Sequence, residues 1–166
     1  AFAVKDHRFI AVGTSSDILN LASSGSEIID AEGMTVTPGF IDAHSHPSSG
    51  GVNELVQVNA DLRSVVEIKQ AIAERARNTP RGQWVRAFKY DDTKLDEGRP
   101  VNRFDLDEAA PENPVVVGHR GGHTGVYNSM ALAMAGVTSE TPDPADGRFY
   151  RDENGVLTGR VADKAR

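Results

Sequence analysis

Two of the five histidines in this chain, His44 and His46, stand two residues apart in the stretch GFIDAHSHPSSGG. Side chains alternate along a β-strand, so both imidazoles point to one face if this stretch is extended. Neutral imidazole is a preferred ligand of zinc, and a bound zinc ion activates water near neutral pH. The spacing therefore predicts a pair of metal ligands. The alternative is a strand that ends by chance with one packed and one solvated histidine.

Other side chains with ligand or acid–base chemistry follow two expected strands. Asp91 and Asp92 come after WVRAFKY, and His119 and His123 flank RGG after PVVVG. Paired carboxylates in a loop are usually just hydrated, and a loop histidine can simply hydrogen-bond its own loop. Each residue is therefore a candidate functional residue, with a structural role as the alternative. For His119 the structural role is favoured.

Composition and charge narrow the choice of partners. The formal net charge is -6 with a pI near 5.3, and we find no basic patch, which disfavours a nucleic acid or an anionic membrane as partner. There is no cysteine, so any metal must bind His, Asp, Glu or a modified Lys. No apolar run approaches the roughly 20 residues of a membrane span. The first residue is not Met, and a leader segment upstream of it would lie outside this sequence.

The elements that must position these residues follow from the hydropathy pattern. We expect a strand pair over 2–13, a short helix over 15–23, strands within 27–44, a helix over 64–78, strands over 84–88 and 114–119, a helix over 128–135, and a strand or turn from 155. Ser64 and Glu67 form a capping box, and Gly136 is placed to end the last helix. Loops are expected over 90–103 and 138–147. The order favours an α/β protein with a small β-rich preface.

Several stretches resemble the amidohydrolase superfamily, in the branch that includes the N-substituted formamide deformylases. They are VTPGFIDAHSH, FIAVG, GQWVRAFKYDD, GRPVNRFDLDEAAPENPVVV, GGHTGVYNSMALAMAGV and DENGVLTGRVADKA, and several of them agree in order and spacing. The resemblance implies an α/β fold in which the chain holds part of a TIM-type (β/α)8 barrel, part of a small β-sandwich domain and an α+β insertion after the first barrel strand. A full barrel takes about 200 to 250 residues or more, so we expect the N-terminal portion of a larger protein.

This resemblance also divides the chain. Residues 1–36 would belong to the β-sandwich, 37–51 would be the first barrel strand and metal-site loop, 52–150 the insertion and following barrel segments, and 151–166 the start of the next barrel segment.

The resemblance assigns roles to three residues in the expected active-site cavity. His123, followed by Asn128 and Ser129, matches the family pattern of a Gly-His step and an Asn-Ser pair, although Gly121 stands where relatives usually carry an Asp. This implies that His123 assists catalysis, for example by steadying an oxyanion, and that Asn128 contacts substrate. Asp92 falls where the family has side chains that line the substrate cavity.

The expected metal ligands are His44, His46 and Asp163. The two histidines take the places of the first-strand ligands, and Asp163 stands where relatives usually carry a Glu. Lys164 beside it could be the carbamylated ligand of some superfamily members. A solvated Asp-Lys pair is the favoured alternative for these last two residues.

The function implied is that of a metal-dependent hydrolase cleaving a C–N bond of an amide or formamide-type small molecule. One or two divalent ions are expected, with zinc first and iron or manganese as alternatives. The rival hypothesis is an incomplete, non-catalytic fragment or a binding module with the fold but no full metal site. We expect a cytoplasmic protein and a homo-oligomer, neither of which the residues decide.

Overall fold

The computed structural model describes all residues, 1–166, and the chain forms two compact units, residues 1–44 and 45–166. The boundary falls inside the segment 37–51 that was expected to hold the first barrel strand. None of the helices combines the length and the apolar character that a membrane span requires.

The first unit begins with the predicted strand pair. β1 (Phe2–Lys5) and β2 (Arg8–Val12) pair antiparallel. Between them Asp6 and His7 have φ angles of 51° and 61°. Two central residues with positive φ give the hairpin turn whose twist matches that of the strands. The hairpin prediction is confirmed.

The short helix predicted next is also confirmed, as α1 (Ser15–Leu19) with Thr14 accepting a hydrogen bond from a backbone amide at its N-terminus. The strands predicted within 27–44 are not formed, because residues 20–46 contain turns, bends and irregular backbone only. A strand is held by hydrogen bonds to a neighbouring strand, and an isolated extended segment lacks them. No strand is formed within 37–46 in this chain, and the assignment of 37–51 to a first barrel strand stays a prediction.

A helix that was not predicted, α2 (Pro47–Val56), follows instead of a strand exit. Proline suits the first position of a helix, because its fixed φ is helical and the amide that it lacks has no partner there. His46 is the N-cap residue, and its carbonyl accepts hydrogen bonds from the amide of Gly50 and the hydroxyl of Ser49. The Pro-Ser-Ser-Gly run thus starts a helix.

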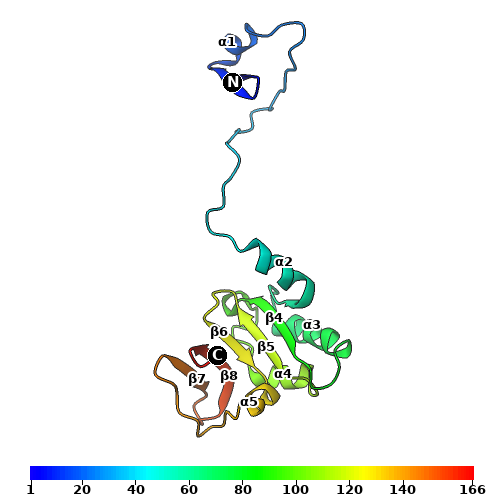
Figure 1. Cartoon of the computed structure of the whole chain (residues 1–166), viewed down its shortest axis with the longest axis vertical. Helices are drawn as coiled ribbons and strands as arrows, with labels where there is room; N and C mark the ends of the chain where they lie inside the picture. Colours follow the sequence, from blue (N-terminus) through cyan, green and yellow to red (C-terminus); the bar gives the residue numbers. More distant parts are fainter. The chain divides into compact units, whose positions relative to one another are not determined.

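The second unit is built on one mixed six-stranded sheet with the order β3-β4-β5-β6-β8-β7 (Figure 1). Its strands are β3 (Val58–Asn59), β4 (Val85–Tyr90), β5 (Val115–His119), β6 (Thr124–Tyr127), β7 (Gly147–Arg151) and β8 (Leu157–Asp163). The first three strands in this order are parallel, and the remaining neighbours are antiparallel. The strands predicted at 84–88, 114–119 and from 155 are confirmed, whereas β3, β6 and β7 were not predicted.

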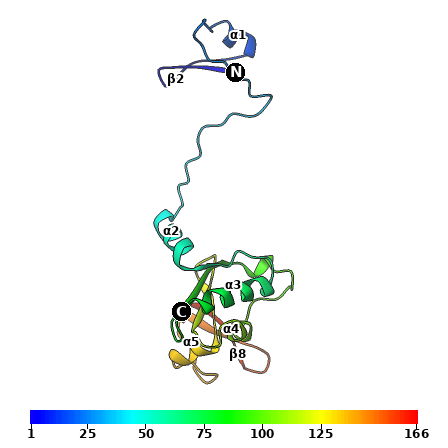
Figure 2. The ribbon, with the colours of Figure 1, turned by 90° about the vertical axis from the view of Figure 1, so that its right-hand side faces the viewer.

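Helices α3 (Val65–Arg77) and α4 (Arg103–Ala109) pack against the sheet (Figure 2), and α5 (Ser129–Met134) follows β6. The capping box predicted at the start of α3 is present. The core between helices and sheet consists of side chains at most 7% exposed, among them Ile68, Ile72, Val85, Ala87, Leu106, Val115 and Val117. Alternate residues of β4 and β5 thus supply one buried face of the sheet.

The fold class is confirmed as mixed α/β, with an open mixed sheet. The six strands of this sheet do not close on themselves, so a barrel is not shown.

Candidate functional site

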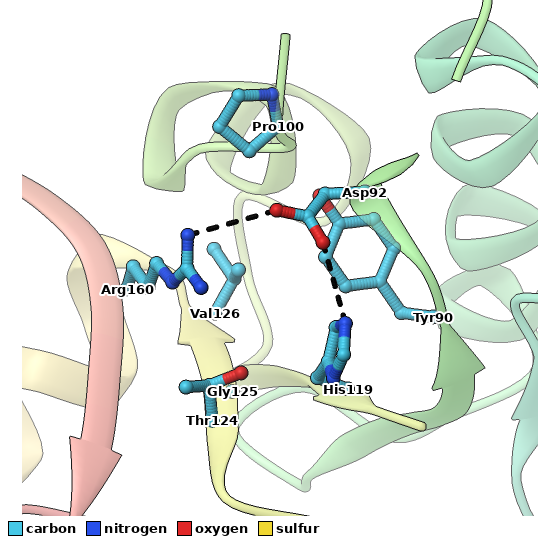
Figure 3. A pocket seen from close by; sticks show the side chains of 8 residues that line it. All are labelled: Tyr90, Asp92, Pro100, His119, Thr124, Gly125, Val126 and Arg160. Carbon is cyan, nitrogen blue, oxygen red and sulfur yellow. Dashed lines mark ion pairs between the residues drawn. The ribbon is translucent and has the colours of Figure 1, made fainter. Parts of the chain in front are cut away.

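A small pocket lies where β4 and β5 end (Figure 3). It is lined by Tyr90, Asp92, Pro100, His119, Thr124, Gly125, Val126 and Arg160. Because β4 and β5 are parallel, their carboxyl ends meet at one sheet edge, where ligand sites of α/β proteins commonly lie. The volume of about 10 Å³ suffices for one water-sized group.

An irregularity in β4 aims the residues that follow toward this pocket. Lys89 has a φ of 62°, and the pairing register of β4 with β5 shifts between Ala87 and Tyr90. Such a bulge bends a strand and re-aims its side chains. Tyr90 is 3% exposed, its hydroxyl accepts a hydrogen bond from the Val101 amide, and burial raises its pKa to about 12.

The Asp92 carboxylate lies between two cationic or hydrogen-bonding groups (Figure 3). Its Oδ1 is 3.3 Å from Nε2 of His119, and its Oδ2 is 3.6 Å from Nη1 of Arg160. The other ring nitrogen of His119, Nδ1, accepts a hydrogen bond of 3.1 Å from the amide of Gly121. The imidazole also packs edge-on against Tyr90, with ring centroids 6.1 Å apart.

Asp91 is buried, only 3% exposed, and has a different environment. It caps the 3-10 turn η1 (Asp92–Lys94), and its Oδ1 accepts hydrogen bonds from the amide and the hydroxyl of Thr93. Its Oδ2 is 3.0 Å from Nε of Arg120. The hydrogen bond from the Thr93 hydroxyl lowers the pKa of Asp91, and the Thr93 amide and the Arg120 charge lower it further. Together they outweigh burial, which raises the pKa.

By residue type and spacing, Asp91, Asp92 and His119 could hold a divalent metal ion. One donor atom from each lies within 4.8 Å of the others. Carboxylate and imidazole ligands together suit zinc, iron or manganese.

The predicted catalytic His123 and the predicted metal ligand Asp163 are brought together, although not in this pocket. Nδ1 of His123 lies 3.4 Å from Oδ1 of Asp163, and the amide of Asp163 donates to the His123 carbonyl. The side chains are 83% and 57% exposed. Such an open pair contributes little to stability. Catalysis by His123 and metal binding by Asp163 stay predictions.

Asn128, predicted to contact substrate, is 1% exposed. Its Oδ1 accepts hydrogen bonds from the amides of Val115 and Ala131, and its Nδ2 donates to the carbonyl of Asn113. The side chain therefore caps the N-terminus of α5 and links Val115, the first residue of β5, to Asn113 in the turn before it. The buried hydrogen bonds give Asn128 a structural role, and its contact with substrate stays a prediction.

His44 and His46 are exposed, and the boundary between the two units falls between them. The backbone amide of His44 donates to Oδ1 of Asp42, which forms a local turn. The strand alternation that was to place both rings on one face does not apply here, because no strand is formed. Metal binding by the pair stays a prediction.

From the sequence, Asp92 was expected to line a substrate cavity and His119 to have a structural role, and Tyr90 and Arg160 were not predicted to take part in a site. His119 ends a predicted strand, which was the available signal. Arg160 reaches the pocket because β8 pairs antiparallel with β6 and places Arg160 opposite Val126. This pairing joins residues far apart in the chain, so no local pattern could have revealed it.

A model of the amidohydrolase family matches residues 27–166, and the chain therefore belongs to this family. It is 35% identical to the N-substituted formamide deformylase of Arthrobacter pascens, over 99% of the chain and 31% of that protein. It is 32% identical to the exoenzymes regulatory protein AepA of Pectobacterium carotovorum subsp. carotovorum, over 98% of the chain and 36% of that protein. The chain thus spans about a third of these curated relatives.

Among solved structures, an uncharacterized metal-dependent hydrolase from Pyrococcus horikoshii OT3 is similar, with 25% identity and a TM-score of 0.48. The match covers 99% of this chain and 30% of that chain.

Proposed function

We propose that this chain is the N-terminal part of a metal-dependent amidohydrolase that cleaves a C–N bond of an amide or formamide-type small molecule. The observation that carries the proposal is the 35% identity to a formamide deformylase over 99% of the chain, together with the family match from residue 27 onward. The matched region includes His44 and His46, the residues whose chemistry first pointed to a metal.

In the complete protein we propose a TIM-type (β/α)8 barrel. Residues 1–36 would belong to a small β-sandwich, 37–51 to the first barrel strand, 52–150 to the insertion and following barrel segments, and 151–166 to the next barrel segment. The pairing absent for 37–46 in this chain would then come from strands of the barrel, because parallel barrel strands are hydrogen-bonded on both sides.

The donor set suits the proposed metal, because two imidazoles and a carboxylate are ligands that zinc, iron and manganese accept. His44 and His46, with Asp163, would hold one or two ions. When bound, such an ion supplies an activated water and polarises the substrate carbonyl. His123 would donate a hydrogen bond to the developing oxyanion, and Asp92 would contact the substrate. We also propose a cytoplasmic homo-oligomer.

A second candidate is a non-catalytic fragment or binding module. The absence of a strand at the His44–His46 segment favours it, and two histidines supply only half of a tetrahedral shell. The similarity to a protein named as a regulatory protein points the same way.

The test compares the 166-residue chain with the product of the longest reading frame that contains it. Each is assayed for metal content and for amine release from N-substituted formamides. The enzyme proposal expects stoichiometric metal and turnover in the longer protein, both lost in His44→Ala and His46→Ala. The matched control is His7→Asn, which changes an exposed hairpin histidine. A longer protein without metal or turnover would overturn the proposal, and stoichiometric metal in the short chain would refute the fragment alternative.

A further inference from the structure

The hydrogen bonds around His119 determine which ring nitrogen carries the proton. Nδ1 accepts a hydrogen bond of 3.1 Å from the amide of Gly121. An accepting ring nitrogen bears a lone pair and no hydrogen, so the neutral imidazole has its hydrogen on Nε2. The backbone thus fixes the tautomer.

Nε2 faces a carboxylate, as a donor should. It lies 3.3 Å from Oδ1 of Asp92. With Nδ1 accepting from Gly121 and Nε2 protonated, neither nitrogen of His119 offers a lone pair to a metal. A metal-bound histidine normally donates its second ring nitrogen to a carboxylate or carbonyl, whereas here the second nitrogen is an acceptor.

The two carboxylates of the cluster are also poorly suited to a cation. Asp91 already accepts two hydrogen bonds from Thr93 and faces Arg120. Asp92 faces Arg160. The two arginine charges balance the two carboxylate charges, so the cluster has no net negative charge to attract a divalent ion, and the guanidinium groups would repel it.

We propose that Asp91, Asp92 and His119 do not form a metal site, and that His119 and Arg160 are instead positioning residues that hold the Asp92 carboxylate between them. Nε2 of His119 lies 3.3 Å from one carboxylate oxygen, and Nη1 of Arg160 lies 3.6 Å from the other. The cluster is therefore closed on itself by groups of this chain, with no donor atom set aside for a cation.

The first test is ¹⁵N NMR of the imidazoles of the 166-residue chain, without metal and with equimolar Zn²⁺. We expect His119 in the Nε2–H form in both samples, with the exposed His7 as internal reference. Zinc-induced shifts at His119 would overturn the inference. A response at His44 and His46 alone would support both the inference and the proposed metal site. No response at any histidine would support the inference while counting against the proposed metal site.

Two changes test the positioning role. Asp92→Ala should speed the exchange of the His119 Nε2 hydrogen with water at least severalfold. Gly121→Pro removes the donor to Nδ1, but Asp92 still favours the Nε2–H form, so the two tautomers should mix only in the double variant Asp92→Ala/Gly121→Pro. Slow exchange in Asp92→Ala, or a single tautomer in the double variant, would contradict the inference.

Discussion

Arg99 and Asp105 form a two-pronged ion pair at the start of α4. Nη1 of Arg99 lies 2.7 Å from Oδ2 of Asp105, and Nη2 lies 2.9 Å from Oδ1. The same carboxylate accepts a hydrogen bond from the amide of Asn102 and so completes a capping box. Parallel hydrogen bonds from a guanidinium are among the strongest that a carboxylate receives. The pair therefore fixes the loop before α4 to the helix itself.

This pair predicts acid sensitivity. Burial raises the pKa of Asp105, but the hydrogen bonds from Arg99 and Asn102 outweigh it and lower the pKa overall. A carboxyl with a lowered folded-state pKa stabilises fully above its unfolded value of about 3.9, and this stability is lost as pH falls through the folded value. Asp105→Asn should cost about 1.5 to 3 kcal/mol at pH 7, and less at pH 3. Urea unfolding at both pH values measures this, with the exposed Glu153→Gln as control. An equal cost at both would contradict the prediction.

Gly159 and Gly155 form a matched pair for testing backbone strain. Both have positive φ, 89° and 77°. A side chain at Gly159 would overlap the backbone oxygen of Tyr127 and the Cβ of Arg103, whereas Gly155 faces open space. Gly155→Ala should cost about 1 kcal/mol from its φ alone, and Gly159→Ala roughly 2 to 4 kcal/mol because overlap adds to it. Thermal unfolding of both variants measures the difference, and similar losses would refute the overlap.

Asn128 separates a structural role from a substrate contact. Asn128→Ala removes the partner of two backbone amides and of the Asn113 carbonyl, and it should cost about 2 to 4 kcal/mol. Asn128→Asp keeps the acceptor but places a carboxylate against the Asn113 carbonyl, so it should be destabilising too. Chemical unfolding gives both values. A change within about 0.5 kcal/mol, as at ordinary surface positions, would contradict the structural role.

Tyr90 predicts a loss of stability in alkali. Burial raises its pKa to about 12, while an unfolded tyrosine ionises at about 10. Above pH 10 the unfolded chain therefore releases a proton that the folded chain retains, and stability falls by up to about 2 to 3 kcal/mol as pH approaches 12. In Tyr90→Phe the stability should fall less steeply above pH 10, since Tyr127 and Tyr150 are present in both the variant and the wild-type chain. The urea midpoint is measured from pH 8 upward, and parallel curves would contradict the prediction.

Local signals explain why much of the fold could be predicted. The hairpin at residues 2–13, the capping box of α3 and the Gly136 end of the last helix each depend on neighbours within a few residues. The strand over 37–46 was predicted on the same grounds and is not formed, because a strand also requires a distant partner. β6 and β7 are short and contain Gly125 and Gly147, which weaken a strand pattern.

The site was less predictable than the fold. Asp92 and His119 could be named because Asp92 follows one predicted strand and His119 ends another. The position of the hydrogen on the His119 ring, however, depends on the turn that brings the Gly121 amide close to Nδ1. The buried hydrogen bonds of Asn128 likewise depend on the paired strands around it. In each case the residue type indicated a possible ligand. The surrounding turns and strands, however, determine which hydrogen bonds its oxygen and nitrogen atoms make.

The two edge strands of the mixed sheet, β3 and β7, limit how copies of the second unit can associate. On one side the outermost strand, β3, offers only two residues of backbone. On the other, Arg151 of β7 donates hydrogen bonds to the carbonyls of Ser139 and Thr141 and so draws a loop toward that strand. Short or covered edges deprive a second chain of a template for strand addition. Self-association of this unit would therefore use side-chain surfaces rather than a continuous intermolecular sheet.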